Sequence, residues 1–124
     1  ESAWQWLVCL RYIELNPVRA GITQSPAGFR WTSFHCNGLG LPDSLISPHP
    51  AYQALGANVE ERLTAYRAFV AQGCQREEAD EIRAMTSRHR AFGGKRFKDE
   101  LEAAHSRAMG IVKRGRPKLA LEAE

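Results

Sequence analysis

A tyrosine and an asparagine near the start of the chain have a spacing that would place a phenol beside an amide. Tyr12 and Asn16 are four residues apart, so on a helix they project from the same face about one turn apart. A phenol can attack a phosphodiester and hold the broken strand as a phosphotyrosine. Because a phenol ordinarily has a pKa of about 10, it needs help from a metal or a base. An amide oxygen is a suitable ligand for Mg²⁺.

The same two residues also have a purely structural interpretation. A tyrosine on a helix is more often a half-buried packing residue, and an asparagine before a proline commonly ends a helix. By spacing alone the structural interpretation is the more common one. Arg11 and Arg19 flank the pair and would meet DNA phosphates, although helix arginines more often face solvent.

The elements that must position these side chains are predicted to be almost all helical. Apolar residues recur every three to four positions in residues 3–16, at Ala3, Trp6/Leu7, Leu10 and Ile13, which predicts a helix. Proline at position 17 should stop it, and a short helical turn could follow, ending at a glycine. This helix is apolar enough to require a partner surface, and no strand is predicted to supply one.

The rest of the chain is predicted to form a loop and four more helices. Residues 22–47 are rich in glycine and proline and are expected to be irregular, anchored by Phe29, Trp31 and Phe34. Trp31 could instead stack on an unpaired base. Capping signals predict helices at 47–56 and 58–72, and periodic apolar residues predict helices at 76–91, which opens with two glutamates, and at 96–109. The inward faces of the last two should comprise Ala79, Ile82, Met85 and His89, and Phe97, Leu101, Ala104 and Ala108.

The basic character of the chain lies in one short segment. The net charge is +3, and without the four positive charges of residues 113–118, KRGRPK, it would fall from +3 to −1. Arg-Gly-Arg-Pro resembles the core of an AT-hook, in which Arg114 and Arg116 would lie in an A·T minor groove. Lys113 and Lys118 would add phosphate contacts. The alternative is a solvated basic tail without sequence preference.

Several other kinds of site are disfavoured. The three cysteines are odd in number and far apart, which argues against a disulfide framework or a zinc finger. The spacings of His35, Cys36, Cys74 and His89 match no zinc pattern. His49, between two prolines, is expected to have a structural role at a helix start. Without a long apolar run or a signal-peptide pattern, we expect a cytoplasmic protein with no membrane partner.

One segment resembles a known family. RYIELNPVRAGI, residues 11–22, is similar to the segment around the catalytic tyrosine of single-tyrosine HUH transposases, and most of all to the branch called REP-associated tyrosine transposases. FRWTSF, SPHPAYQALG and KRGRPK are also similar to segments of bacterial members, in the same order. The resemblance spans nearly the whole chain, and YIELNPVRAG is its specific part.

The resemblance implies a ferredoxin-like α+β domain, usually a homodimer, that processes single-stranded, hairpin-bearing DNA. In that family two histidines, written His-hydrophobic-His, bind Mg²⁺ or Mn²⁺ and polarise the scissile phosphate. The tyrosine attacks to give a 5′-phosphotyrosine and a free 3′-hydroxyl. Tyr12 matches this nucleophile, and Asn16 matches the residue four positions later that often completes the metal shell.

The chain departs from the family at the metal site. Its four histidines are His35, His49, His89 and His105, and no two are separated by a single residue. A lone asparagine would hold Mg²⁺ poorly, so we expect this chain alone not to bind the metal or cleave DNA.

The missing histidine pair indicates a C-terminal fragment of a longer transposase, mainly α in structure. Residues 1–46 would be the end of the catalytic domain, 47–109 a helical extension and 110–124 a basic, disordered tail. Two other classes of function remain open: a non-catalytic helical DNA-binding module derived from a transposase, and a helical protein-interaction domain. An in-frame His-hydrophobic-His encoded upstream of Glu1 would favour the enzyme.

Overall fold

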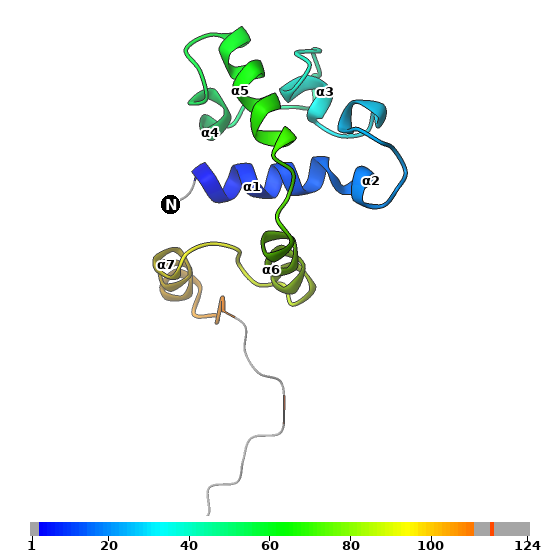
Figure 1. The fold of residues 1–124 in the computed structure, drawn as a ribbon. Coiled ribbons are helices and arrows are strands. Elements are labelled where there is room, and N and C mark those ends of the chain that lie inside the picture. Colours follow the sequence, from blue (N-terminus) through cyan, green and yellow to red (C-terminus); the bar gives the residue numbers. More distant parts are fainter. Residues whose placement is uncertain (1–2, 111–114, 116–124) are drawn as a thin grey trace, which may run out of the picture.

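Helices are the only regular secondary structure in the described part of the chain. The computed structural model describes residues 3–110 and residue 115; helices make up 58% of it and no strand is present there, which confirms the mainly α expectation. The elements are α1 (Ala3–Glu14), α2 (Asn16–Arg19), a 3₁₀ turn η1 (Pro26–Gly28), α3 (Phe34–Asn37), α4 (Pro50–Gln53), α5 (Val59–Ala71), α6 (Arg76–Ser87) and α7 (Lys95–His105) (Figure 1). No helix among these residues is long and apolar enough to cross a membrane.

Helix α1 runs through the middle of the fold, with α4 and α5 on one side and α6 and α7 on the other (Figure 1). Its buried residues are Leu7, Val8, Arg11 and Glu14. Leu7 belongs to the apolar stripe that the sequence predicts, but after it the buried stripe is shifted by one residue, and Ile13 is left 55% exposed. The partner surface that this helix was expected to require is supplied in part by helices of the same chain, which cover its buried stripe.

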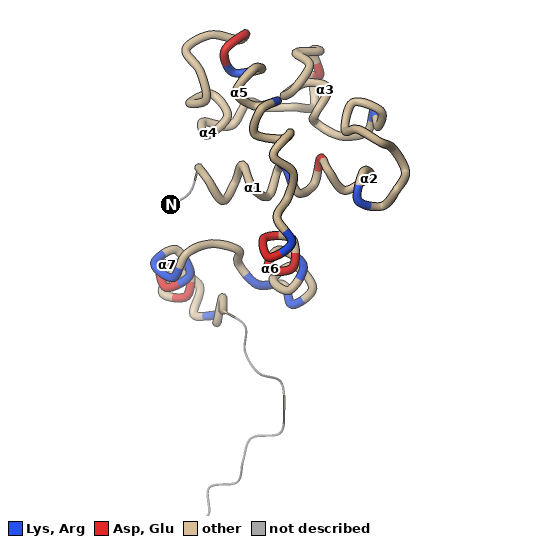
Figure 2. Tube along the Cα trace, viewed as in Figure 1, with Lys and Arg blue, Asp and Glu red and all other residues tan. Residues whose placement is uncertain are grey.

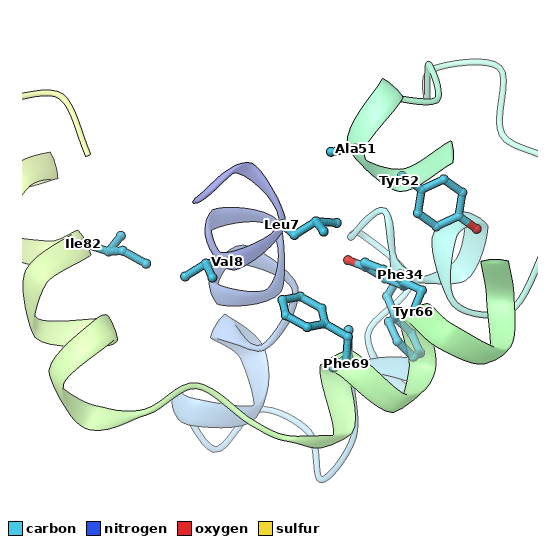
Figure 3. Close-up of a cluster of buried hydrophobic side chains, with 9 residues drawn as sticks. Leu7, Val8, Phe34, Ala51, Tyr52, Tyr66, Phe69 and Ile82 are labelled. Atoms are coloured by element: carbon cyan, nitrogen blue, oxygen red, sulfur yellow. The ribbon is translucent and has the colours of Figure 1, made fainter. Parts of the chain in front are cut away.

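The core joins both halves of the chain. Its buried members are Leu7, Val8, Phe34, Ala51, Tyr52, Tyr66, Phe69, Val70 and Ile82 (Figure 3). The tyrosine rings of α4 and α5 meet edge to face, with 5.4 Å between the ring centroids, an arrangement that aromatic pairs prefer. The predicted segments 1–46 and 47–109 therefore contribute to one and the same core.

As predicted, the first helix ends before Pro17 and a short helical turn follows: α1 stops at Glu14 and α2 spans Asn16–Arg19, with helical backbone at Leu15 between them. The amide of Leu15 donates to the carbonyl of Arg11 at 2.9 Å, and the amide of Arg19 donates to the carbonyl of Leu15 at 3.0 Å. Pro17 lies in the first turn of α2, where a helix needs no N–H donor. The path ends at Gly21, whose φ of +71° is favoured by glycine.

Helix α4 starts two residues later than the sequence predicts. His49, and not Ser47, is the N-cap, and its side chain accepts a hydrogen bond from the amide of Ala51 at 3.1 Å. Pro50 is the first helical residue. The segment SPHP contains the polar-then-proline signal twice, and the second copy is the one used. The structural role expected for His49 is confirmed.

The start of α5 is as predicted. Asn58 is the N-cap, and its Oδ1 accepts the amide of Glu61 at 2.9 Å. The Glu61 carboxylate accepts in turn from the side chain of Asn58 at 2.9 Å and from the amide of Ala57 at 2.8 Å. These contacts satisfy N–H groups that the first turn of a helix leaves without partners.

We expect Asn58→Ala to lower the free energy of unfolding by about 1 kcal/mol, because the first turn of α5 loses its capping acceptor. Urea denaturation followed by circular dichroism measures the change. Gln53→Ala, at an exposed position of α4, is the control and should stay within about 0.5 kcal/mol of wild type. Equal midpoints for the two variants would contradict the capping role.

Helices α6 and α7 differ in how firmly they are buried. Ala79, Ile82 and Met85 of α6 are buried as predicted, but α6 ends at Ser87, so His89 lies outside it with a φ of +51° and is exposed. Its placement on the inward face is therefore wrong. Lys, Arg, Asp and Glu are interspersed along both helices (Figure 2).

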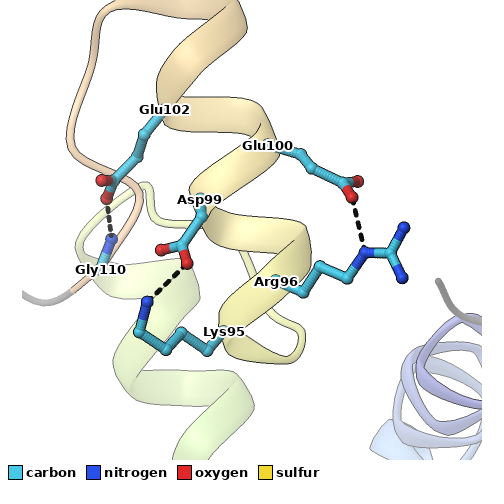
Figure 4. A network of polar contacts seen from close by, with 6 residues as sticks. All are labelled: Lys95, Arg96, Asp99, Glu100, Glu102 and Gly110. Carbon is cyan, nitrogen blue, oxygen red and sulfur yellow. Dashed lines mark hydrogen bonds and ion pairs between the residues drawn. The ribbon is translucent and has the colours of Figure 1, made fainter.

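Helix α7 has no buried residue. Phe97 and Leu101 are half-buried, whereas the predicted inward residues Ala104 and Ala108 are exposed, because α7 lies at the edge of the fold. Its surface carries ion pairs between Lys95 and Asp99 at 2.5 Å and between Arg96 and Glu100 at 2.9 Å. The Glu102 carboxylate accepts the amides of Met109 and Gly110 at 2.7 and 3.3 Å (Figure 4).

Candidate functional site

The continuous path through α1 and α2 brings three of the predicted site residues into contact. Tyr12, Asn16 and Arg19 are spaced by four and three residues, so they share one face. The guanidinium carbon of Arg19 lies 3.9 Å from the centroid of the Tyr12 ring. The Nη2 of Arg19 donates a hydrogen bond to Oδ1 of Asn16 at 2.7 Å. The same-face arrangement of Tyr12 and Asn16 is thus present, with an arginine between them.

Two nitrogen atoms of this arginine have no hydrogen-bond partner in the described residues. Nε and Nη1 of Arg19 are both buried and unpaired there. The Tyr12 side chain is half-buried, and Asn16 is exposed. Arginine presents its donors in a fixed fork that suits an oxyanion such as a phosphate, but these two nitrogen atoms are covered by protein atoms, so a phosphate would reach them only if the side chain turned outward.

The described residues do not fit a complete Mg²⁺ or Mn²⁺ site. Such ions require several oxygen or nitrogen ligands, and no group of three or more His, Cys, Asp or Glu side chains placed to hold a metal occurs in the described part of the chain. The predicted ligand oxygen of Asn16 already accepts from Arg19. A cation at this oxygen would lie beside the positive guanidinium, which repels it.

The structure places Arg11 in the interior, where it cannot meet a DNA phosphate. This residue is 3% exposed. Its Nη2 donates to the Glu78 carboxylate at 2.7 Å, and its guanidinium carbon lies 4.3 Å from the centroid of the Phe69 ring. Arg11 therefore joins α1 to α5 and α6, and we leave it out of the candidate site.

A buried glutamate next to the site was not predicted from the sequence. Glu14 is 0% exposed. Its carboxylate accepts hydrogen bonds from Ser33 Oγ at 2.5 Å, Tyr66 Oη at 2.6 Å and Asn37 Nδ2 at 3.2 Å. Burial raises the pKa of Glu14, and these three donors lower it by less. Burial beside Glu14 also raises the pKa of Tyr66, so its hydroxyl stays protonated and donates.

Trp31 is not the core anchor that the sequence predicts. Its side chain is 73% exposed, and the Arg30 guanidinium carbon lies 4.3 Å from the centroid of its ring. Phe34 alone of the three predicted anchors is buried, while Phe29 is half-buried. The exposed indole leaves the alternative role, stacking on an unpaired base, open to test.

The remaining candidates lie apart from this cluster or outside the described residues. Cys9, Cys36 and Cys74 are free thiols, and burial raises the pKa of each. The imidazole of His35 hydrogen-bonds the carbonyl of Ala27 at 2.8 Å. Outside the described residues lie the predicted DNA-binding residues of the basic segment, Lys113, Arg114, Arg116 and Lys118.

Comparison of the chain with the profiles of known protein families, with curated proteins and with solved structures found no match in any of the three.

Proposed function

We propose that this chain is the nucleophile-bearing part of a DNA-processing enzyme of the single-tyrosine transposase kind. In this proposal Tyr12 attacks a phosphodiester of single-stranded DNA. The observation that carries the proposal is the contact between Tyr12, Asn16 and Arg19 on one helix face. The resemblance of RYIELNPVRAGI to the family's tyrosine segment adds independent support.

Each of the three side chains has a distinct part in the proposed reaction. The phenol oxygen of Tyr12 forms a bond to phosphorus as the bond from phosphorus to the 3′-oxygen breaks, which leaves a 5′-phosphotyrosine and a 3′-hydroxyl. The phenolic proton leaves to solvent, and the departing 3′-oxygen takes a proton up. The N–H groups of Arg19, which are buried as the side chain now lies, donate to the non-bridging phosphate oxygens once the guanidinium turns toward the bound strand. Asn16 holds the guanidinium over the phenol.

The proposed enzyme also needs a His-hydrophobic-His pair and the strands of a ferredoxin-like domain. In this proposal both come from outside the described residues. A surface for such strands is offered by the apolar stripe that the helices of this chain leave open. Ile13 is 55% exposed and Leu10 is half-buried. A helix with an open apolar stripe gains stability when a further layer covers it.

The test is a covalent-adduct assay with 3′-end-labelled, hairpin-bearing single-stranded DNA and Mn²⁺, read on a denaturing gel. It compares this chain alone with the same chain preceded by the sequence encoded in frame upstream of Glu1. We expect an adduct only with the longer product, provided that it contains a His-hydrophobic-His. Tyr12→Phe should abolish the adduct, and Arg19→Ala should reduce its rate at least about tenfold.

Tyr52→Phe is the matched control, because it removes a different tyrosine hydroxyl, one that donates to the carbonyl of Asn37 at 2.9 Å in the core. It should leave the adduct intact. An adduct that survives Tyr12→Phe would sink the proposal, as would the absence of any adduct when the histidine pair is present. An adduct at Tyr12 with this chain alone would overturn its expected inactivity.

The contact of Arg19 with Asn16 also favours a second function, a non-catalytic DNA-binding module derived from a transposase. With the amide oxygen taken by a guanidinium, the same three residues could bind a phosphate without cleaving it. In that case the longer product would bind single-stranded DNA, with affinity falling in Arg19→Ala, and Tyr12→Phe would change nothing.

A further inference from the structure

A cavity of about 350 Å³ lies beside the N-terminal half of α1. Its walls are largely aromatic: Phe92 comes from the connection between α6 and α7, and Phe97 from α7. Trp6 and His49 form another wall, with their rings stacked at 4.0 Å between centroids and 9° between planes. A cavity of this size accepts a small planar molecule, at the lower end of the range for ligand sites.

Two polar groups that make no hydrogen bond within the described residues also line this cavity, one on His49 and one on Gln5. The Nδ1 of His49 accepts the amide of Ala51 at 3.1 Å, so the neutral ring carries its proton on Nε2. Within the described residues, neither this Nε2 nor the amide of Gln5 makes a hydrogen bond. Apolar walls with a few unpaired polar groups are the usual composition of a site that binds and orients a ligand.

The cavity continues the helix face that carries the candidate nucleophile. Gln5, Cys9, Tyr12 and Asn16 follow one another at spacings of four, three and four residues, so they lie in one row along α1 and into α2. Gln5 and Cys9 line the cavity. Seven residues separate Gln5 from Tyr12, about 10 Å along the helix axis. A chain of nucleotides with a phosphate at Tyr12 and Arg19 would therefore pass the cavity.

We propose that this cavity holds one unpaired nucleobase of the single-stranded DNA bound along this face. That single-stranded DNA binds along this face rests on the proposed function; that one of its bases enters this site rests on the lining of the cavity. Aromatic walls stack with any base. The Gln5 amide offers a donor and an acceptor, and His49 Nε2 a donor, to the polar edge of the base. The base so held would set where a strand lies relative to Tyr12.

The experiment measures binding of a fluorescein-labelled single-stranded 12-mer to the full chain by fluorescence anisotropy, with Tyr12→Phe present so that no strand is cut. A series of the same oligonucleotide carries one abasic site at successive positions. We expect an abasic site at one position to weaken binding at least about fivefold, the lower bound for losing one stacked base, and the others to have smaller effects.

Three variants change the cavity without removing a core residue. Ala3→Phe fills it from its exposed rim, Gln5→Leu removes the amide, and His49→Asn removes the ring but keeps a capping side chain. Each should weaken binding of the intact oligonucleotide and abolish the difference between intact and abasic probes. Gln53→Leu, exposed on α4 and outside the cavity, should leave both unchanged.

Equal losses at every abasic position, or cavity variants that bind like wild type, would overturn the inference. So would binding of free nucleosides at the cavity with no binding of the oligonucleotide, which would assign it to a small aromatic molecule. The adduct assay and this assay fail separately. If an abasic site weakens binding but no Tyr12 adduct forms, the base-binding cavity is supported and the role of Tyr12 as nucleophile is contradicted. If an adduct forms but no abasic site has a particular effect, the nucleophile is supported and the base-binding cavity is contradicted.

Discussion

Glu14→Ala is expected to lower the free energy of unfolding by about 3 kcal/mol, because each buried donor left without an acceptor costs about 1 to 3 kcal/mol. Three donors would lose their acceptor: Ser33 and Asn37 at the two ends of α3, and Tyr66 of α5. A buried donor without a partner keeps its full cost of leaving water. Because a small domain is stable by only about 5 to 15 kcal/mol, the variant should unfold at much lower urea.

Two comparisons separate the network from the loss of a charge alone. Glu14→Gln keeps an acceptor oxygen and the side-chain volume, so its loss of stability should be clearly smaller than that of Glu14→Ala. Glu81→Ala removes an exposed glutamate of α6 and should stay within about 0.5 kcal/mol of wild type. Equal losses for Glu14→Ala and Glu81→Ala would contradict the network.

The pH dependence of stability, compared between wild type and Glu14→Gln, tests the raised pKa of Glu14. Because burial raises the pKa of Glu14 in the folded chain, the folded chain holds this proton to a higher pH than the unfolded chain does. The resulting stabilisation is complete below the unfolded pKa, about 4.3, and is lost as pH rises through the folded pKa. The stability gap between wild type and Glu14→Gln should therefore narrow from pH about 4 to neutrality; a gap that widens would contradict the raised pKa.

Arg11→Ala is expected to cost about 3 kcal/mol or more, because it leaves the Glu78 carboxylate without its partner and removes packing against Phe69. Hydrogen exchange measures where the loss falls. The amides of α6 should exchange faster by a larger factor than those of α5, since the Arg11–Glu78 pair joins α6 to α1.

A surface arginine on α6 provides the matched control. Arg76 is 91% exposed and lies 3.9 Å from Asp80, so Arg76→Ala should change stability little. Arg11→Met, which refills the buried volume without a charge, should recover part of the loss. If Arg11→Ala and Arg76→Ala are equally stable, the buried ion pair does not hold α6.

Local signals in the sequence predicted the elements well where one signal stood alone. Asn58 with Glu61 marks the start of α5 because both residues act on amides within the same turn. The four-residue spacing of Tyr12 and Asn16 predicted their shared face for the same reason. Where signals were duplicated, as in SPHP, the start of α4 was placed at the wrong copy.

Local sequence patterns could not predict the contacts that hold α1 in the fold. The buried face of α1 contains Arg11 and Glu14 and leaves out the apolar Ile13. The partners of the two charged residues lie far away in the sequence. Tyr66 is 52 residues from Glu14, and Glu78 is 67 residues from Arg11. Only their meeting in the fold makes burial of two charged residues favourable. Arg19 was predicted as a residue flanking the tyrosine, but its position over the Tyr12 ring depends on the helical backbone at Leu15, which local patterns did not indicate.

Residues 12 and 14 point to nearly opposite sides of α1, because two positions along a helix turn the side chain by about 200°. The helical turn that carries the phenol is therefore held in place on its opposite side by the hydrogen bonds that the Glu14 carboxylate accepts. Small errors in the approach of a reacting group are costly in rate. If Tyr12 is the nucleophile, as proposed, the contacts of Glu14 would fix the position of its hydroxyl, and a variant that weakens them would lower the reaction rate under conditions where the protein is still folded.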